Sequence, residues 1–115
     1  MKDEYNANPE GWKKNYAEVL GRQAYIAIFQ QYFTEAEQLA REGITIDSTK
    51  HRIVRSFAAA LLFQGKYAEA ESIYRQYKAE LKESFLEDFN QFAEAGVIPP
   101  ECEADVEKIK RILND

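Results

Sequence analysis

Two arginines three residues apart, Arg52 and Arg55, are the residues of this chain best suited to bind a ligand. Residues three apart on an α-helix lie on the same face, so their guanidinium groups point the same way. Together they can donate directed hydrogen bonds to one carboxylate, which predicts contact with an acidic segment of a protein or peptide. Two other interpretations stay open: the arginines pair with surface acids such as Glu18 or are solvated, or they serve self-association.

No catalytic or metal-binding motif is present in the sequence. The chain has no glycine-rich phosphate loop, no Cys-x-x-Cys and no His-x-x-x-His. Its single cysteine, Cys102, lies far in sequence from its single histidine, His51, so we expect a reduced thiol at the start of a helix. We therefore expect no enzymatic activity, no cofactor and no metal ion.

The carboxylates are numerous, and several are close neighbours in sequence. Glu35 with Glu37, and Glu87 with Asp88, occupy nearby helical positions that do not converge on one point. We interpret these pairs as a solvated face.

Length and charge restrict the class of protein further. The 115 residues match the usual size of one domain, expected here over residues 1–115, and the formal net charge of −5 argues against a nucleic-acid binder. The N-terminus is polar and no apolar run is long enough for a membrane span, so we expect neither a signal peptide nor membrane insertion. A reduced thiol and no signal peptide favour the cytoplasm, although signals in a longer parent chain would lie outside this sequence.

An internal repeat with a period of about 34 residues organises the chain. The segment "QQYFTEAEQLAREGITIDST" (30–49) aligns with "QGKYAEAESIYRQYKAELKE" (64–83), which places Ala36 on Ala70. A segment repeated at this period is one supersecondary unit that must pack on its neighbours. Upstream positions match at the same offset, namely Leu20, Ala24 and Ala27 with Val54, Ala58 and Leu61.

Gly65 divides the stretch "LLFQGKYAEAESIYRQYK" (61–78) into two helices. Glycine adopts a positive φ without steric cost and is therefore typical of a helix C-terminus. Beyond it, Ala70, Ile73 and Tyr74 recur at helical spacing and mark one buried stripe. Ala36 and Ala70 are small because two helix backbones approach each other there. The pattern predicts an antiparallel helix pair.

Cap residues predict where two of the helices start. Asn8 can cap a helix whose first position is Pro9, so the first helix starts early and carries Trp12 on its extra turns. In "IDST" (46–49), Asp47 and the two hydroxyl residues after it are available as an N-cap for the next helix.

A third, degenerate helix pair is predicted over about residues 85–113. "SFLE" can form a capping box between Ser84 and Glu87, Gly96 ends that helix, and the following prolines make the turn. The core stripe of its first helix is Phe85, Phe89 and Phe92. The apolar face of its second helix is Val106, Ile109, Ile112 and Leu113.

With this period, an alanine at each helix crossing and an aromatic after each turn, the chain resembles the tetratricopeptide-repeat family. The repeats cover about residues 17–50 and 51–84, and the third pair would cap the stack. The resemblance implies an all-α fold, a right-handed α-solenoid of about six helices in antiparallel pairs. "ALLFQGKYAEAESIY" followed by "FLEDF" and "AGV" is also similar to the C-terminal repeat module of larger bacterial proteins.

The family resemblance implies a protein-binding scaffold whose first helices line a concave groove. In that groove the family places an extended peptide or a helix of a partner protein. The asparagine of the family's carboxylate clamp is missing, since Tyr25 and Ala59 occupy its positions. The expected partner-binding residues are Arg52, Arg55, Tyr25, Ile28, Phe29, Leu62 and Phe63.

Two alternatives remain for the apolar part of this groove. Tyr25, Ile28 and Leu62 are either core residues covered by the third helix pair, or an exposed strip that binds a peptide or another subunit. The second function that we consider is therefore a structural module that uses such a strip for self-association or for the rest of a larger protein.

Ala70→Leu tests the predicted helix crossing. We expect the extra bulk to overpack the contact and to lower the free energy of unfolding by about 1 to 3 kcal/mol. Thermal unfolding followed by circular dichroism measures the change, and an unchanged midpoint would contradict a close helix approach at this residue.

Overall fold

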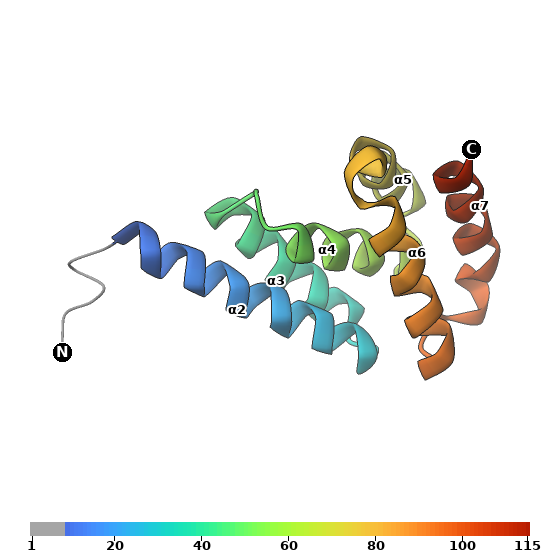
Figure 1. The fold of residues 1–115 in the computed structure, drawn as a ribbon. Helices are drawn as coiled ribbons and strands as arrows, with labels where there is room; N and C mark the ends of the chain where they lie inside the picture. The colour runs from blue at the N-terminus through green and yellow to red at the C-terminus, as the bar shows by residue number, and fades with distance from the viewer. Residues whose placement is uncertain (1–8) are drawn as a thin grey trace.

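The computed structural model of this protein describes residues 9–115, which form six α-helices and one short 3-10 helix, with no strand among them. The predicted all-α class is confirmed. Figure 1 shows the helices in chain order from α2 to α7, which lies at the C-terminus. The α-helices are α2 (Pro9–Phe29), α3 (Phe33–Ile46), α4 (His51–Phe63), α5 (Tyr67–Gln76), α6 (Lys78–Ala95) and α7 (Glu103–Asn114), and the 3-10 helix is Pro100–Cys102.

The turn at Gly65 separates α4 from α5, as predicted. Gly65 has a φ of +84°, which an L-residue with a side chain rarely adopts. The backbone N–H of Lys66 donates to the carbonyl of Leu61 at 3.0 Å, and that of Gly65 donates to Leu62 at 3.0 Å. These bonds satisfy the last carbonyls of α4 and reverse the chain.

The turn between α2 and α3 has the same geometry without a glycine. Gln31, which lies one repeat period before Gly65, has a φ of +66°. The N–H of Tyr32 donates to the carbonyl of Ala27 at 2.9 Å, and the N–H of Gln31 donates to Ile28 at 2.9 Å. The repeat therefore imposes a left-handed conformation on a residue with a side chain, which costs free energy.

The start of α2 agrees with the sequence. The helix begins at Pro9 and carries Trp12 in its early turns, as predicted, whereas the proposed cap Asn8 lies outside the described residues. The cap predicted for α4 is wrong, because Lys50 is the N-cap residue and no side chain caps the helix. Asp47 instead accepts hydrogen bonds from the N–H and hydroxyl of Thr49 and closes a local turn before the helix starts.

The boundary between the second and third helix pairs was predicted too late. The chain bends at Tyr77 and α6 begins at once with Lys78, so Ser84 lies inside the helix and forms no capping box. The segment "KAELKE" consists of strong helix formers, and Leu81 buries its side chain, so the helix resumes directly after the bend. Gly96, with a φ of +71°, ends α6 as predicted.

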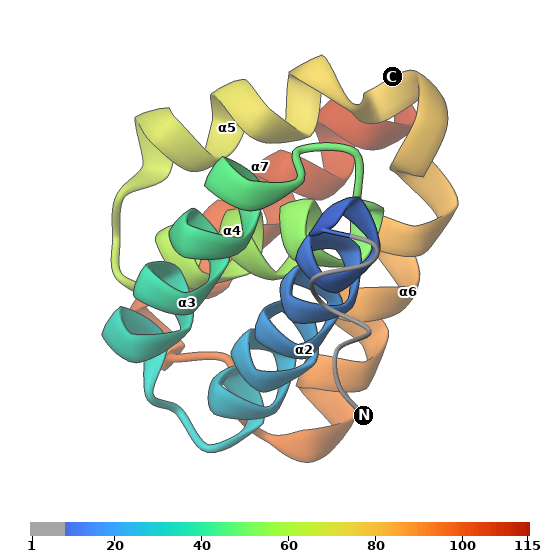
Figure 2. The same cartoon turned by 90° about the vertical axis from the view of Figure 1, so that its left-hand side faces the viewer.

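The core confirms the small residues and the aromatic stripe expected from the sequence. Ala36 and Ala70 are fully buried. The stripe of α6 is also buried, and its Phe92 ring lies 5.1 Å from the Phe29 ring and 5.6 Å from the Phe63 ring, centroid to centroid. Thus α6 packs on α2 and α4, and Figure 2 shows α3 and α6 on opposite sides of α2. The predicted face of α7 is buried at Val106, Ile109 and Leu113 and partly buried at Ile112.

The two equivalent turns provide a matched stability test. Gln31→Gly should raise the free energy of unfolding by about 1 kcal/mol, because glycine relieves the left-handed strain. Gly65→Gln should lower it by a similar amount for the same reason. Urea unfolding measures both, and a loss of stability in Gln31→Gly would contradict the strain inferred at this turn.

Candidate functional site

Three of the residues predicted to bind a partner meet in one cleft. Tyr25 of α2 and Arg52 and Arg55 of α4 line a hollow of about 290 Å³, whose opposite wall belongs to α6. The hydroxyl of Tyr25 donates a hydrogen bond to the side chain of Gln91, which ties α2 to α6 at the edge of the cleft. The residues that α6 contributes to the lining are Ser84, Glu87 and Gln91.

The two arginines of the cleft have different environments. Arg55 forms a bidentate ion pair with Asp88 of α6, with Nε to Oδ2 at 2.9 Å and Nη2 to Oδ1 at 2.6 Å. Asp88 is buried, and burial raises the pKa of its carboxyl, which the hydrogen bonds from Arg55 oppose. The charge of Arg55 is therefore compensated inside the protein, and the expectation that Arg55 binds a ligand is corrected. The prediction that Asp88 is a solvated carboxylate is corrected as well.

Arg52 differs from Arg55 in having no ion-pair partner in the described part of the chain. Its side chain is exposed. Glu18, the acid considered as its surface partner, instead pairs with Lys50 at 3.2 Å. Arg52 also lines a second hollow of about 200 Å³ on the N-terminal side of the first, together with Arg22 and His51. Arg52 thus lines both hollows, which together we call the Arg52 cleft.

The apolar part of the predicted groove is covered by the chain itself. Ile28 and Leu62 are fully buried and Phe63 is 4% exposed, so these three are core residues. Tyr25 and Phe29 are partly buried, and both rings pack against Phe92 of α6. The alternative in which the strip belongs to the core holds for Ile28 and Leu62, whereas Tyr25 is only partly covered and also lines the cleft. The expectation that Ile28, Leu62 and Phe63 contact a partner is corrected.

The sequence contained an unused signal for Asp88. This residue lies on the helical stripe of Phe85, Phe89 and Phe92, one turn from two of these rings. A carboxylate on a buried stripe requires a cationic partner, because an unpaired buried charge is costly. Its position therefore indicated an inter-helix ion pair, but nothing local identified Arg55 as the partner.

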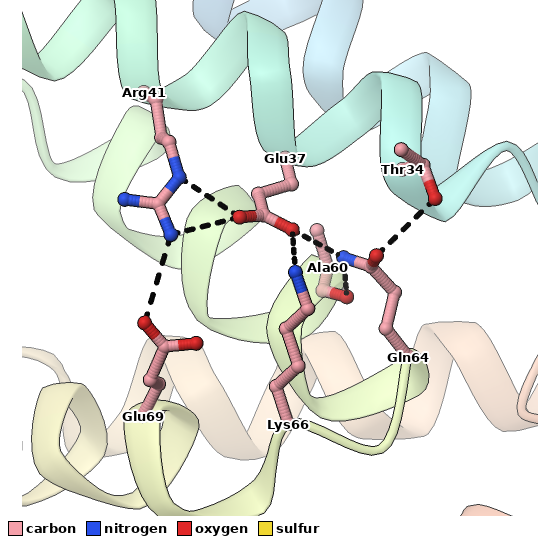
Figure 3. A network of polar contacts seen from close by, with 7 residues as sticks. All are labelled: Thr34, Glu37, Arg41, Ala60, Gln64, Lys66 and Glu69. Carbon is pink, nitrogen blue, oxygen red and sulfur yellow. Dashed lines mark hydrogen bonds and ion pairs between the residues drawn. The ribbon is translucent and has the colours of Figure 1, made fainter.

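A second polar cluster surrounds Glu37 of α3 (Figure 3). Its Oε2 accepts a hydrogen bond from Nε of Arg41 at 2.8 Å, one turn later on the same helix. Its Oε1 accepts from Lys66 Nζ at 2.9 Å and from Gln64 Nε2 at 2.7 Å. The amide of Gln64 also donates to the carbonyl of Ala60 in α4. One carboxylate therefore connects α3 with the turn between α4 and α5.

The surroundings of Glu37 stabilise an ionised carboxylate. The residue is only 6% exposed, which corrects the prediction that it is solvated. Burial alone would raise its pKa, but the hydrogen bonds from Lys66, Gln64 and Arg41 outweigh burial and lower the pKa from 4.5 to about 2. Its bonding capacity is used within the protein, so we assign the cluster to stability and the Arg52 cleft to candidate function.

Other chemistry is limited in the described part of the chain. Cys102 is a buried free thiol at the start of α7, and burial raises its pKa, so it is poorly suited to act as a nucleophile. Residues 9–115 contain no cluster of metal-ligating side chains, and none of their helices is long and apolar enough to cross a membrane. Comparisons with protein-family models, with curated proteins and with solved structures found no match to the chain.

The low pKa of Glu37 predicts a specific pH dependence. A carboxylate whose pKa falls on folding stabilises the protein above its unfolded pKa, and this contribution is lost as the pH drops toward the folded value. We expect Glu37 to contribute about 3 kcal/mol at neutral pH and to lose this between about pH 5 and pH 2. The stability gap between the wild type and Glu37→Gln should therefore close across this range.

Glu35→Gln is the matched control for this measurement, because Glu35 is an exposed carboxylate on the same helix. Urea unfolding at several pH values should show no such closing gap for this variant. A gap for Glu37→Gln that is the same at pH 7 and pH 3 would contradict the role assigned to the ionised carboxylate.

Proposed function

We propose that this chain is a protein-interaction module that binds an acidic segment of a partner protein at the Arg52 cleft. The observation that carries the proposal is the difference between the two arginines. Arg55 is neutralised by Asp88, whereas Arg52 is exposed, has no ion pair within the described residues and lines two adjoining clefts. A guanidinium in this position is a ready donor for a carboxylate.

Local charge in the second cleft supports an acidic ligand, although the whole chain is acidic and the first cleft also contains Glu87. Arg22, Lys50 and His51 line the second cleft beside Arg52, and the only acid in its lining is Glu18, which already pairs with Lys50. A local cationic patch attracts an anionic segment, whereas the net charge of −5 repels other copies of the chain at longer range. The binding should therefore weaken as salt is added.

The shape of the site suits an extended segment. The two clefts share Arg52 in their linings, both are lined by residues of α2 and of the N-terminal half of α4, and the far wall of the first cleft is α6. We place an acidic side chain on Arg52 and a neighbouring side chain against Tyr25. In this proposal the helix pairs stack as a right-handed α-solenoid of the tetratricopeptide-repeat type, and the ligand lies along their first helices.

The second function considered from the sequence, a structural or self-associating module, requires a different surface from the one expected. Of the strip of Tyr25, Ile28 and Leu62, the last two are fully buried and are unavailable to another subunit. One observation still favours an association of this kind, namely a row of exposed apolar side chains on α2. That row shares no residue with the Arg52 cleft.

Charge reversal at Arg52 tests the proposed function. Affinity capture from the lysate of the source organism compares the wild type, Arg52→Glu and the control Arg111→Glu, which changes an exposed arginine on α7. We expect a partner that the wild type and the control retain and that Arg52→Glu loses. In a titration with the partner's acidic segment, the substitution should weaken binding about 10-fold or more, because it replaces an attraction with a repulsion.

Circular dichroism must show equal helicity for the three proteins in this comparison. Repeating the titration at higher salt should weaken the wild type more than Arg52→Glu. The same set of partners for all three proteins would contradict the proposal and leave Arg52 as a solvated surface residue.

A further inference from the structure

The outer face of α2 carries an unusual concentration of exposed apolar groups. Five large apolar side chains are exposed in residues 11–115, and all of them lie on α2 or in the turn after it. Three of them form a row at helical spacing, with Tyr16 39%, Val19 41% and Ile26 49% exposed. Together with Gln23 these residues form what we call the α2 stripe, and the other two exposed groups, Trp12 and Tyr32, lie beyond its ends.

The internal repeat identifies what kind of surface the α2 stripe is. One repeat period after Val19, Gln23 and Ile26, the equivalent residues of α4 are Ile53, Phe57 and Ala60. In α4 these equivalent positions are covered, since Ile53 and Ala60 are fully buried and Phe57 is partly buried.

At Ile53 this side of α4 is covered by both α2 and α3, since a Cβ atom built on Gly21 of α2 would lie 2.8 Å from Cγ1 of Ile53. A Cβ atom built on Gly43 of α3 would lie 3.0 Å from Cδ1 of Ile53, so α3 and α4 are in close contact there. The contacts farther along, at Phe57 and Gln64, come from α3. The guanidinium of Arg41 lies 4.9 Å from the centre of the Phe57 ring. Two turns after Phe57, the side-chain amide of Gln64 donates a hydrogen bond to Glu37 of α3.

We infer that the α2 stripe is a docking face for one amphipathic helix that has the chemistry of α3. Opposite Val19 the helix carries glycine or alanine, as Gly43 is opposite Ile53. Opposite Gln30, which is the repeat equivalent of Gln64, it carries a glutamate that accepts the side-chain amide. This inference does not depend on the proposed function of the Arg52 cleft.

A second copy of the chain fits this face less well. Its own α2 would present Tyr16, Val19 and Ile26, which are too large for the close approach that Gly43 makes to Ile53. Its α3 is already packed between α2 and α4, and its α7 carries none of the five exposed apolar groups. The structure therefore favours a helix with small residues from another segment or protein over self-association.

A tethered helix tests this inference on the full chain. The chain is extended at its N-terminus by a Gly/Ser linker of about 15 residues, which spans about 20 Å, preceded by a second copy of residues 33–46. If the added helix docks on the α2 stripe, the midpoint of thermal unfolding should rise by about 4 °C or more. Two controls keep the tether but remove the fit: Val19→Glu in the body, and Gly43→Leu in the tethered copy.

The expected result is a rise for the unmodified tethered protein and no rise for either control. Val19 is exposed, so Val19→Glu without the tether should leave the midpoint nearly unchanged, which checks that the body still folds. Equal midpoints with and without the tether, or an equal rise in the controls, would overturn the inference. Sedimentation of the unextended chain gives a further test, since a dimer that Val19→Glu dissociates would assign the stripe to a second copy.

Discussion

The packing of α6 on α2 and α4 is the constraint on which the rest of the structure depends. Phe92 inserts its ring among Tyr25, Phe29 and Phe63, and in doing so it excludes water from the apolar half of the surface between α2 and α4. Large aromatic side chains bury much apolar surface per residue, so their burial contributes strongly to the free energy of folding. What would otherwise be an open groove becomes core, and only its polar margin around Arg52 remains accessible.

Two buried carboxylates show how the helices are fixed once the apolar surfaces meet. Glu37 receives hydrogen bonds from three side chains, and these outweigh burial, so its pKa falls. Asp88 has one arginine as its partner and a more apolar environment, so burial dominates and its pKa rises. Each ties together helices that are separate in sequence, α3 to the turn after α4 and α4 to α6. Arg52 has no such partner within the described residues.

The internal repeat explains both the regularity of the chain and its departures from regularity. Gln31 adopts the backbone conformation that Gly65 adopts one repeat period later, because equivalent helix pairs require the same reversal. The equivalence fails at the outer face of α2, where no described helix takes the place that α3 takes beside α4. The outer face of α2 therefore carries apolar residues because it is equivalent to a face of α4 that is buried.

The sequence by itself determined the local features of this protein. The positive φ at Gly65 and Gly96, the repeat period and the aromatic stripe of α6 follow from backbone preferences and helical periodicity, which act over a few residues. Helix starts were less predictable, because Asp47 and Ser84 are typical cap residues that cap no helix here. Asp47 closes a local turn with Thr49, and Ser84 lies inside α6. The tertiary structure alone decided that Arg55 pairs with Asp88 while Arg52 forms no ion pair with any residue of 9–115, and that Ile28 and Leu62 are covered. Burial and ion pairing depend on distances between separate helices, and no local pattern encodes those distances.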